Sequence, residues 1–97
     1  MQKMIDLIVA ELTPAFTACG YDEKYVKVTV SNRPDLCEYQ CNGAMAAAKA
    51  YKKKPIDIAN EVVEQARESG MFSEINAVMP GFINLRIAPE YLAGYMN

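Results

Sequence analysis

Histidine is absent from the 97 residues of this chain. Its absence removes the usual general base, the Ser–His and Cys–His nucleophile pairs and the commonest metal ligand in proteins. Carboxylate or lysine chemistry is still open, but the sequence shows no convergent set of either residue type. We therefore expect the chain by itself to be non-catalytic, with no metal site and no cofactor.

Cysteine is scarce, and its number is odd. Cys19, Cys37 and Cys41 show no Cys-x-x-Cys spacing, and no histidine is present to complete a metal site with them. This pattern is typical of reduced, partly buried thiols in a cytosolic domain.

Long apolar runs are also missing, since none approaches the roughly 20 residues that span a bilayer. The N-terminal stretch carries a single lysine, and acidic residues interrupt its apolar ones, which is not the pattern of a signal peptide. A length of 97 residues is typical of one domain. We expect a cytoplasmic domain with no membrane partner.

The charges are unevenly distributed along the chain. A formal net charge of −2 argues against a general nucleic-acid coat. However, residues 24–54 contain seven bases and two acids, a net of +5, whereas residues 55–74 contain five acids and one base, a net of −4. A domain polarised in this way can bind an anionic ligand on one side. Alternatively, the lysines at 52–54 only complement the dipole at the end of a helix.

Residue periodicity predicts the order of the elements. Spacings of three and four residues indicate helices, and strict alternation indicates strands. Helices are expected over 2–18 and 42–53, from Pro55 and again from Pro89, and strands over 25–31, 72–79 and 82–88. The fold class is therefore α+β, a two-layer sandwich in which helices cover one face of an antiparallel sheet of about four strands, in α-β-β-α-α-β-β order.

Two prolines predict local breaks. Pro14 should kink the first helix or restart it with Thr13 as a cap. Pro80 followed by Gly81 predicts a type II turn, in which Gly81 would supply a positive φ.

Residues 36–40 are open to two interpretations, a short strand or the first turn of a helix. Asp35 and Glu38 fit the acidic variant of a capping box, which favours the helix.

The last strand has one unusual face. Side chains alternate across a strand, so Phe82, Asn84 and Arg86 share a side. An exposed ring, an amide and a guanidinium together suit an unpaired nucleobase, because the ring stacks on the base, the amide bonds its edge and the cation meets phosphate. Alternatively, Phe82 packs under a loop or against another domain, since exposed aromatic residues often mark protein interfaces.

Several linked blocks resemble a known family. The segments "RPDLCEYQCNGAM", "AAAKAYKKKPIDIANEVV" and "MPGFINLRI" are similar, in this order, to the N-terminal additional domain of arginyl-tRNA synthetase. The matching positions are Pro34, Glu38-Tyr39-Gln40, Asn42-Gly43-Ala44-Met45, Lys53 or Lys54, Pro55, Ile58-Ala59 and Pro80-Gly81-Phe82-Ile83-Asn84. The resemblance covers essentially the whole chain.

The resemblance implies a domain over residues 1–88, with residues 89–97 starting a linker helix toward a missing catalytic domain. It implies contact with the D-loop of tRNA(Arg), with Phe82 stacking on an unpaired base and Asn84 bonding its edge. The parent protein would be a class I aminoacyl-tRNA ligase that attaches arginine to its tRNA with ATP and Mg²⁺. Its partners would be tRNA(Arg) and the catalytic domain of the same chain, and not DNA.

Face and charge, rather than the resemblance, add Arg86, Lys27, Lys52 and Lys53 to the candidate RNA-binding residues. Gln40 and Asn42 match the family motif, but we expect them to be structural, because polar residues at the start of a helix usually bond backbone groups.

The chain departs from the family pattern in two places. Met79 stands where the family often has glycine, which affects the turn before Phe82. Cys37-Glu38 stands where it usually has Gly-Asp, so the acidic charge is kept with a different reach. The alternative function is a protein-interaction or domain-docking module that uses the face of Phe82.

Overall fold

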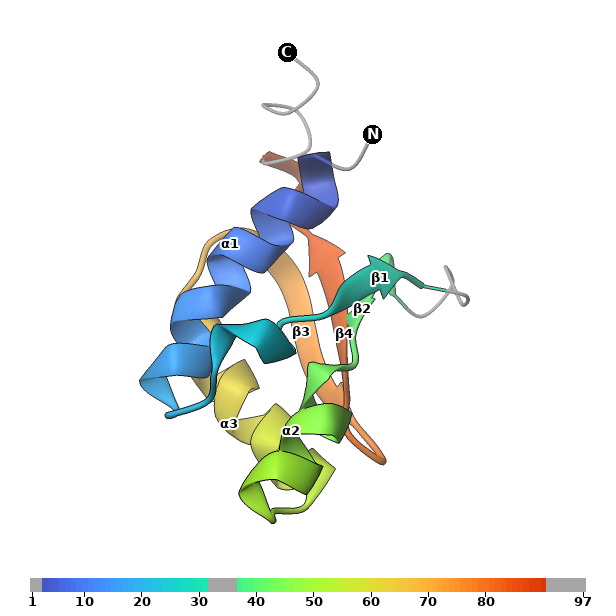
Figure 1. The fold of residues 1–97 in the computed structure, drawn as a ribbon. Helices are drawn as coiled ribbons and strands as arrows, with labels where there is room; N and C mark the ends of the chain where they lie inside the picture. Colours follow the sequence, from blue (N-terminus) through green and yellow to red (C-terminus); the bar gives the residue numbers. More distant parts are fainter. Residues whose placement is uncertain (1–2, 32–36, 91–97) are drawn as a thin grey trace.

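The computed structural model describes residues 3–31 and 37–90. Its elements are α1 (Lys3–Ala18), a 3₁₀ turn η1 (Glu23–Tyr25), β1 (Val28–Val30), β2 (Tyr39–Cys41), α2 (Gly43–Tyr51), α3 (Pro55–Ala66), β3 (Phe72–Val78) and β4 (Phe82–Ile87). The strands form one antiparallel sheet in the order β1-β2-β4-β3, and the helices pack on one side of it (Figure 1). The α+β class, the four strands and the element order are therefore confirmed.

The core lies between the helices and the inner face of the sheet. Each helix contributes a stripe of apolar residues at three- and four-residue spacing, and β4 contributes every second residue. Among the largest side chains that are completely buried are Ile8, Leu12, Phe16, Ile58, Val62, Ile83 and Leu85. This burial fixes which face of β4 points inward.

Helix α1 runs through Pro14 without a restart. The hydroxyl of Thr13 donates a hydrogen bond of 2.7 Å to the carbonyl of Val9, one turn earlier. Thr13 is thus bonded within the helix and does not cap a new one. The prediction of a restart at this point is wrong.

The first strand is shorter than the predicted 25–31. The side chain of Asp22 accepts a hydrogen bond of 2.9 Å from the backbone N–H of Lys24, which starts the turn η1. The ring of Tyr25 then packs against Tyr51, with 5.9 Å between ring centroids. This local capping and the aromatic contact delay the strand until Val28.

The second strand begins beside Glu38, where the sequence favoured a helix. The backbone N–H of Glu38 donates to the carbonyl of Leu85 at 3.0 Å, and Glu38 Oε1 accepts from the N–H of Ile87 at 2.8 Å. The carboxylate therefore bonds the backbone of β4 and does not cap a helix. The helix interpretation is wrong for the described part of this segment, and Asp35 lies outside the described residues.

Glycine is required in two places where backbones meet. A Cβ on Gly43 would overlap the carbonyl oxygen of Tyr25, and one on Gly81 would lie 2.9 Å from the carbonyl carbon of Pro55. Among the described glycines the positive φ belongs to Gly20 and not to Gly81, and the Met79–Pro80 peptide is cis. The prediction of a type II turn is therefore wrong. The absence of a side chain at Gly81 instead lets the β3–β4 turn pack against the start of α3.

Pro89 and Glu90 are helical, as expected, and residues 91–97 lie outside the described part of the chain. No helix within residues 3–31 and 37–90 is long and apolar enough to cross a bilayer.

We expect Gly81→Ala to lower the free energy of unfolding by about 1–3 kcal/mol, because the added methyl group overpacks the contact with Pro55. Urea denaturation would measure the change. Asn42→Ala is the control, since Asn42 is exposed and makes no capping hydrogen bond, and it should stay within about 0.5 kcal/mol of the wild type. Equal stability of Gly81→Ala and the wild type would contradict the close approach.

Candidate nucleic-acid interface

The outer face of β4 carries the three residues that alternation predicted. Ile83, Leu85 and Ile87 are buried beneath the helices, while the side chains between them are half-buried. Phe82, Asn84 and Arg86 therefore lie together on the side of the sheet that no described helix covers.

Neighbouring strands extend this face. Directly opposite residues of an antiparallel pair project to the same side of a sheet. The pairs on the β3 side are Val78 with Phe82, Asn76 with Asn84, and Glu74 with Arg86. On the β2 side Gln40 stands opposite Asn84, and Thr29 of β1 stands opposite Gln40. A polar row of Thr29, Gln40, Asn84 and Asn76 thus crosses the whole sheet.

Gln40 bonds the predicted base-reading residue. Its Nε2 donates a hydrogen bond of 3.0 Å to Asn84 Oδ1. Asn42 precedes α2 and makes no side-chain capping hydrogen bond. Its backbone N–H donates to the carbonyl of Lys27 at 3.1 Å. The prediction that these two side chains bond backbone groups at a helix start is wrong. The alternation of Gln40 with the buried Cys41 is the signal that indicates its outward direction.

Arg86 is not a free cation on this face. Its Nε lies 3.5 Å from Glu74 Oε1, and both side chains are partly exposed. The two residues border an open hollow of about 290 Å³, close to the lower end of the roughly 300–1,000 Å³ that small-molecule pockets occupy. The remaining lining residues are Cys37, Asn76, Val78, Asn84 and Leu85. The hollow is therefore mostly built from the outer face around Asn84.

The end of the face near the β3–β4 turn is apolar. Val78 is 40% exposed and Met79 is 70% exposed, next to the half-buried ring of Phe82. Met79, the residue that departs from the family pattern, thus adds an exposed apolar side chain beside the ring. Contiguous exposed apolar residues of this kind mark binding surfaces.

None of the three predicted lysines belongs to a strand of the sheet. Lys27 is exposed and precedes β1. Lys52 ends α2 in the left-handed conformation, with φ 57°. The α2–α3 connection that contains Lys52 leads into Pro55, against which Gly81 packs. This basic connection and the β3–β4 turn therefore lie at the same end of the domain (Figure 1).

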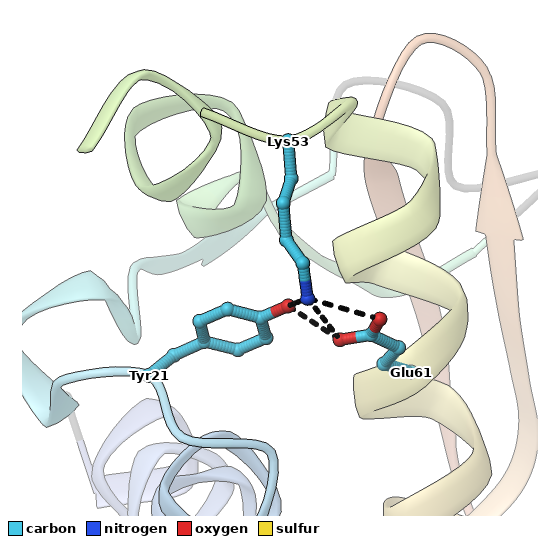
Figure 2. Close-up of polar contacts among 3 residues, drawn as sticks. All are labelled: Tyr21, Lys53 and Glu61. Atoms are coloured by element: carbon cyan, nitrogen blue, oxygen red, sulfur yellow. Dashed lines mark hydrogen bonds and ion pairs between the residues drawn. The ribbon is translucent and has the colours of Figure 1, made fainter. Parts of the chain in front are cut away.

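Lys53 points into a cluster with Tyr21 and Glu61 (Figure 2). Its Nζ donates to Tyr21 Oη at 2.6 Å and lies 3.3 Å from Glu61 Oε2, while the Tyr21 hydroxyl donates to Glu61. These contacts join the segment after α1 to the α2–α3 connection and to α3. Lys53 is thus already paired with a carboxylate. The number of lysines in the sequence had suggested a free cation at this position.

The cluster changes the acid–base properties of its members. The hydrogen bond from Tyr21, followed by the interaction with Lys53, lowers the pKa of Glu61. The hydrogen bonds to Tyr21 and Glu61 raise the pKa of Lys53, and burial followed by the bond to Glu61 raises the pKa of Tyr21. All three groups therefore keep their ordinary charge states across the neutral range.

The described residues offer no ligand set for a metal ion. Within 3–31 and 37–90, no three cysteine, aspartate or glutamate side chains converge as a metal would require.

Several known proteins are similar to this chain. The family described as arginyl tRNA synthetase N terminal domain matches residues 2–87. The chain is 55% identical over its whole length to the arginine–tRNA ligase of Agathobacter rectalis and 48% identical to that of Alkaliphilus oremlandii. It spans 16% of the length of each of these relatives.

Solved structures show the same fold. The arginyl-tRNA synthetase of Thermus thermophilus superposes with a TM-score of 0.77 at 22% identity, over 93% of this chain and 15% of that one. The Plasmodium falciparum enzyme superposes with a TM-score of 0.66 at 23% identity, over 90% of this chain and 17% of that one.

We expect the stability difference between the wild type and Glu61→Gln to depend on pH. The pKa of Glu61 is lowered in the folded state, so its stabilisation is present above the ordinary value of about 4.5 and is lost as the pH falls through the lower, folded value. Tyr21 and Lys53 have raised pKa values and titrate above about pH 10.

Urea titrations from about pH 3 to 8 would measure this difference. The difference in stability between the wild type and Glu61→Gln should be constant near neutrality and shrink in acid. Tyr21→Phe should make this dependence on acid smaller. A difference that is constant down to the lowest pH would show that the cluster does not hold the Glu61 carboxylate.

Proposed function

Because the chain belongs to the family of arginyl-tRNA synthetase N-terminal domains, we propose that its outer sheet face binds tRNA(Arg) at the D-loop. The observation that carries the proposal is the placement of Phe82, Asn84 and Arg86 side by side on the face of β4 that no described helix covers. This face suits an unpaired base whose ring and edge are both accessible, and the D-loop contains such a base.

Phe82 is the stacking platform of the proposed site. Its ring is half-buried, which holds it in place while one part stays open to a ligand. Stacking of one base on an aromatic ring contributes about 1–3 kcal/mol. The exposed Val78 and Met79 beside it extend the apolar surface on which the base or its sugar rests.

Asn84 reads the edge of the stacked base. It lies two residues from Phe82 on the same side of β4 and borders the hollow. A carboxamide presents a donor and an acceptor, and either can form a hydrogen bond with a base edge. Asn84 therefore gives the face its preference among bases.

Phosphate contacts come from the rim. Lys27, Lys52, Lys53 and Arg86 are the proposed cations, but Lys53 and Arg86 each lie close to a carboxylate. The chain also carries a net charge of −2. We therefore expect weak binding that falls with salt, with a shallow slope because few phosphates are neutralised.

The longer protein that would contain this domain is proposed to be a class I ligase that attaches arginine to tRNA(Arg) using ATP. Residues 1–88 would form its tRNA-binding domain, and residues 89–97 would begin the connection to its catalytic domain. In this proposal ATP and Mg²⁺ belong to the catalytic domain of the longer protein and not to residues 1–97. We propose a cytoplasmic location and no DNA partner.

A second candidate function is domain docking through the same face. The observation that favours it is the exposed apolar pair Val78 and Met79 beside Phe82. In that case the substitutions described next would weaken association with a protein surface and leave binding of tRNA unchanged.

We expect Phe82→Ala to weaken binding of tRNA(Arg) by about five- to 150-fold and Phe82→Tyr to leave it nearly unchanged, because tyrosine keeps the ring. NMR titration of the 97-residue chain with tRNA transcripts would measure the weak affinities. Asn84→Ala should also weaken binding, whereas Asn60→Ala, at an exposed position of α3, is the matched control.

The transcript supplies the second arm of this experiment. Replacing the unpaired D-loop base should weaken binding of the wild type and have little effect on Asn84→Ala. If the wild type binds both transcripts equally, base reading is absent.

We expect Glu74→Gln to strengthen tRNA binding more than Glu68→Gln does. Both substitutions remove one negative charge, but only Glu74 lies beside the Arg86 guanidinium. The excess effect, measured by the same titration at low salt, reports the cost of the Glu74 carboxylate beside Arg86. Equal effects of the two substitutions would show that the Glu74–Arg86 ion pair does not weaken binding.

A further inference from the structure

We propose that Gln40 is a positioning residue for Asn84, and that it turns the Asn84 amide so that a hydrogen-bond donor faces the bound nucleotide. The matching atom on the base is then an acceptor, either a ring nitrogen or a carbonyl oxygen. This inference rests on the proposed function, because it concerns the same site.

The sheet register brings the two amides together. Gln40 is the middle residue of β2 and stands directly opposite Asn84 of β4, although 44 positions separate them in the chain. Both residues are half-buried on the outer face. Each is flanked by buried residues that fix the backbone on which it stands, Cys41 beside Gln40 and Leu85 beside Asn84. Their meeting is thus set by the fold.

The hydrogen bond between them couples the two amide orientations, and the structure has the arrangement in which Gln40 donates. A carboxamide can turn over and exchange its oxygen for its nitrogen, and neighbouring donors and acceptors decide which arrangement persists. Gln40 Nε2 donates to Asn84 Oδ1 at 3.0 Å. Turning Asn84 alone would place two N–H₂ groups against each other, which is repulsive.

The orientation determines what the face offers. With Asn84 Oδ1 held toward β2, its Nδ2 is directed away from Gln40, on the side of the sheet where the hollow lies. A base that stacks on Phe82 then meets a donor, and a ring nitrogen such as N1 or N7 of adenine is a suitable acceptor. A fixed donor also discriminates better than a freely turning amide, because it is ordered before binding.

Three substitutions separate the effect of the Asn84 amide orientation from the effect of an added charge. Gln40→Glu replaces the donor by an acceptor, so the Asn84 Nδ2 should turn to donate to the introduced carboxylate and Oδ1 should face the ligand. Thr29→Glu is the matched control. Thr29 neighbours Gln40 on the same face, so this substitution adds the same charge at a position that does not face Asn84. Gln40→Met removes the hydrogen bond at similar size.

The first measurement is made on the free protein by NMR. In the wild type the side-chain amide protons of Gln40 should exchange slowly with solvent and those of Asn84 rapidly. Gln40→Glu should slow the exchange of the Asn84 protons, whereas Thr29→Glu should leave them as in the wild type. Slow Asn84 protons in the wild type would overturn the inference without bearing on whether the face binds RNA.

The second measurement uses tRNA transcripts that carry adenosine, or one of two adenosine analogues, at the contacted D-loop position. For the wild type, a deaza-adenosine that lacks a ring-nitrogen acceptor should weaken binding about fivefold or more, and purine riboside, which lacks the amino donor, should weaken it less. Gln40→Glu should reverse this order. Thr29→Glu should keep the wild-type order with weaker binding overall, and Gln40→Met should reduce the difference between the two analogues.

The outcomes distinguish this inference from the proposed function. Binding that depends on Phe82 but keeps the same analogue order in Gln40→Glu would overturn the inference and leave the proposed function standing. The absence of any binding that depends on Phe82 would overturn both.

Discussion

The position of β4 in the sheet is the constraint on which the rest of this structure depends. β4 pairs with β2 on one side and with β3 on the other, and its residues Ile83 and Leu85 are completely buried under the helices. A shift of one residue in either pairing would exchange the two faces and expose this apolar set. The hydrophobic core thus holds the polar face of β4 in register, and this ties the stability of the fold to the geometry of the candidate site.

Much of the fold could be predicted from the sequence, because the signals for it are local. The alternation in "GFINLRI" indicates a strand with one apolar side, and the spacing of Ile58, Val62 and Val63 indicates a helix with one buried stripe. The choice of outward residues on β4 followed from the same alternation. These predictions needed no knowledge of distant parts of the chain.

The remaining features depend on contacts between distant segments. Glu38 bonds the backbone of Ile87, and Gln40 bonds Asn84, across 49 and 44 positions respectively. Gly81 is needed because Pro55 lies against it and not because of its own φ. A propensity or a capping pattern cannot reveal such partners, since a carboxylate or an amide makes similar bonds in a strand and at a helix start.

Charge has a smaller part in this site than the count of lysines and arginines suggests. Lys53 is bound by Tyr21 and Glu61, and Arg86 lies beside Glu74. An acidic domain with paired cations gains little from general attraction to phosphate. In the proposed function, its preference for one nucleic acid depends on the ring of Phe82 and the oriented amide of Asn84, which act only on an unpaired and accessible base.

The central claim is that an unpaired D-loop base stacks on Phe82. Its most direct test is an intermolecular nuclear Overhauser effect experiment on the 97-residue chain mixed with tRNA(Arg). Our account requires contacts between the ring protons of Phe82 and the aromatic protons of that one base, with the Asn84 amide protons shifted in the same complex. Contacts of the RNA confined to the helical side of the domain, with Phe82 and Asn84 unperturbed, would contradict it.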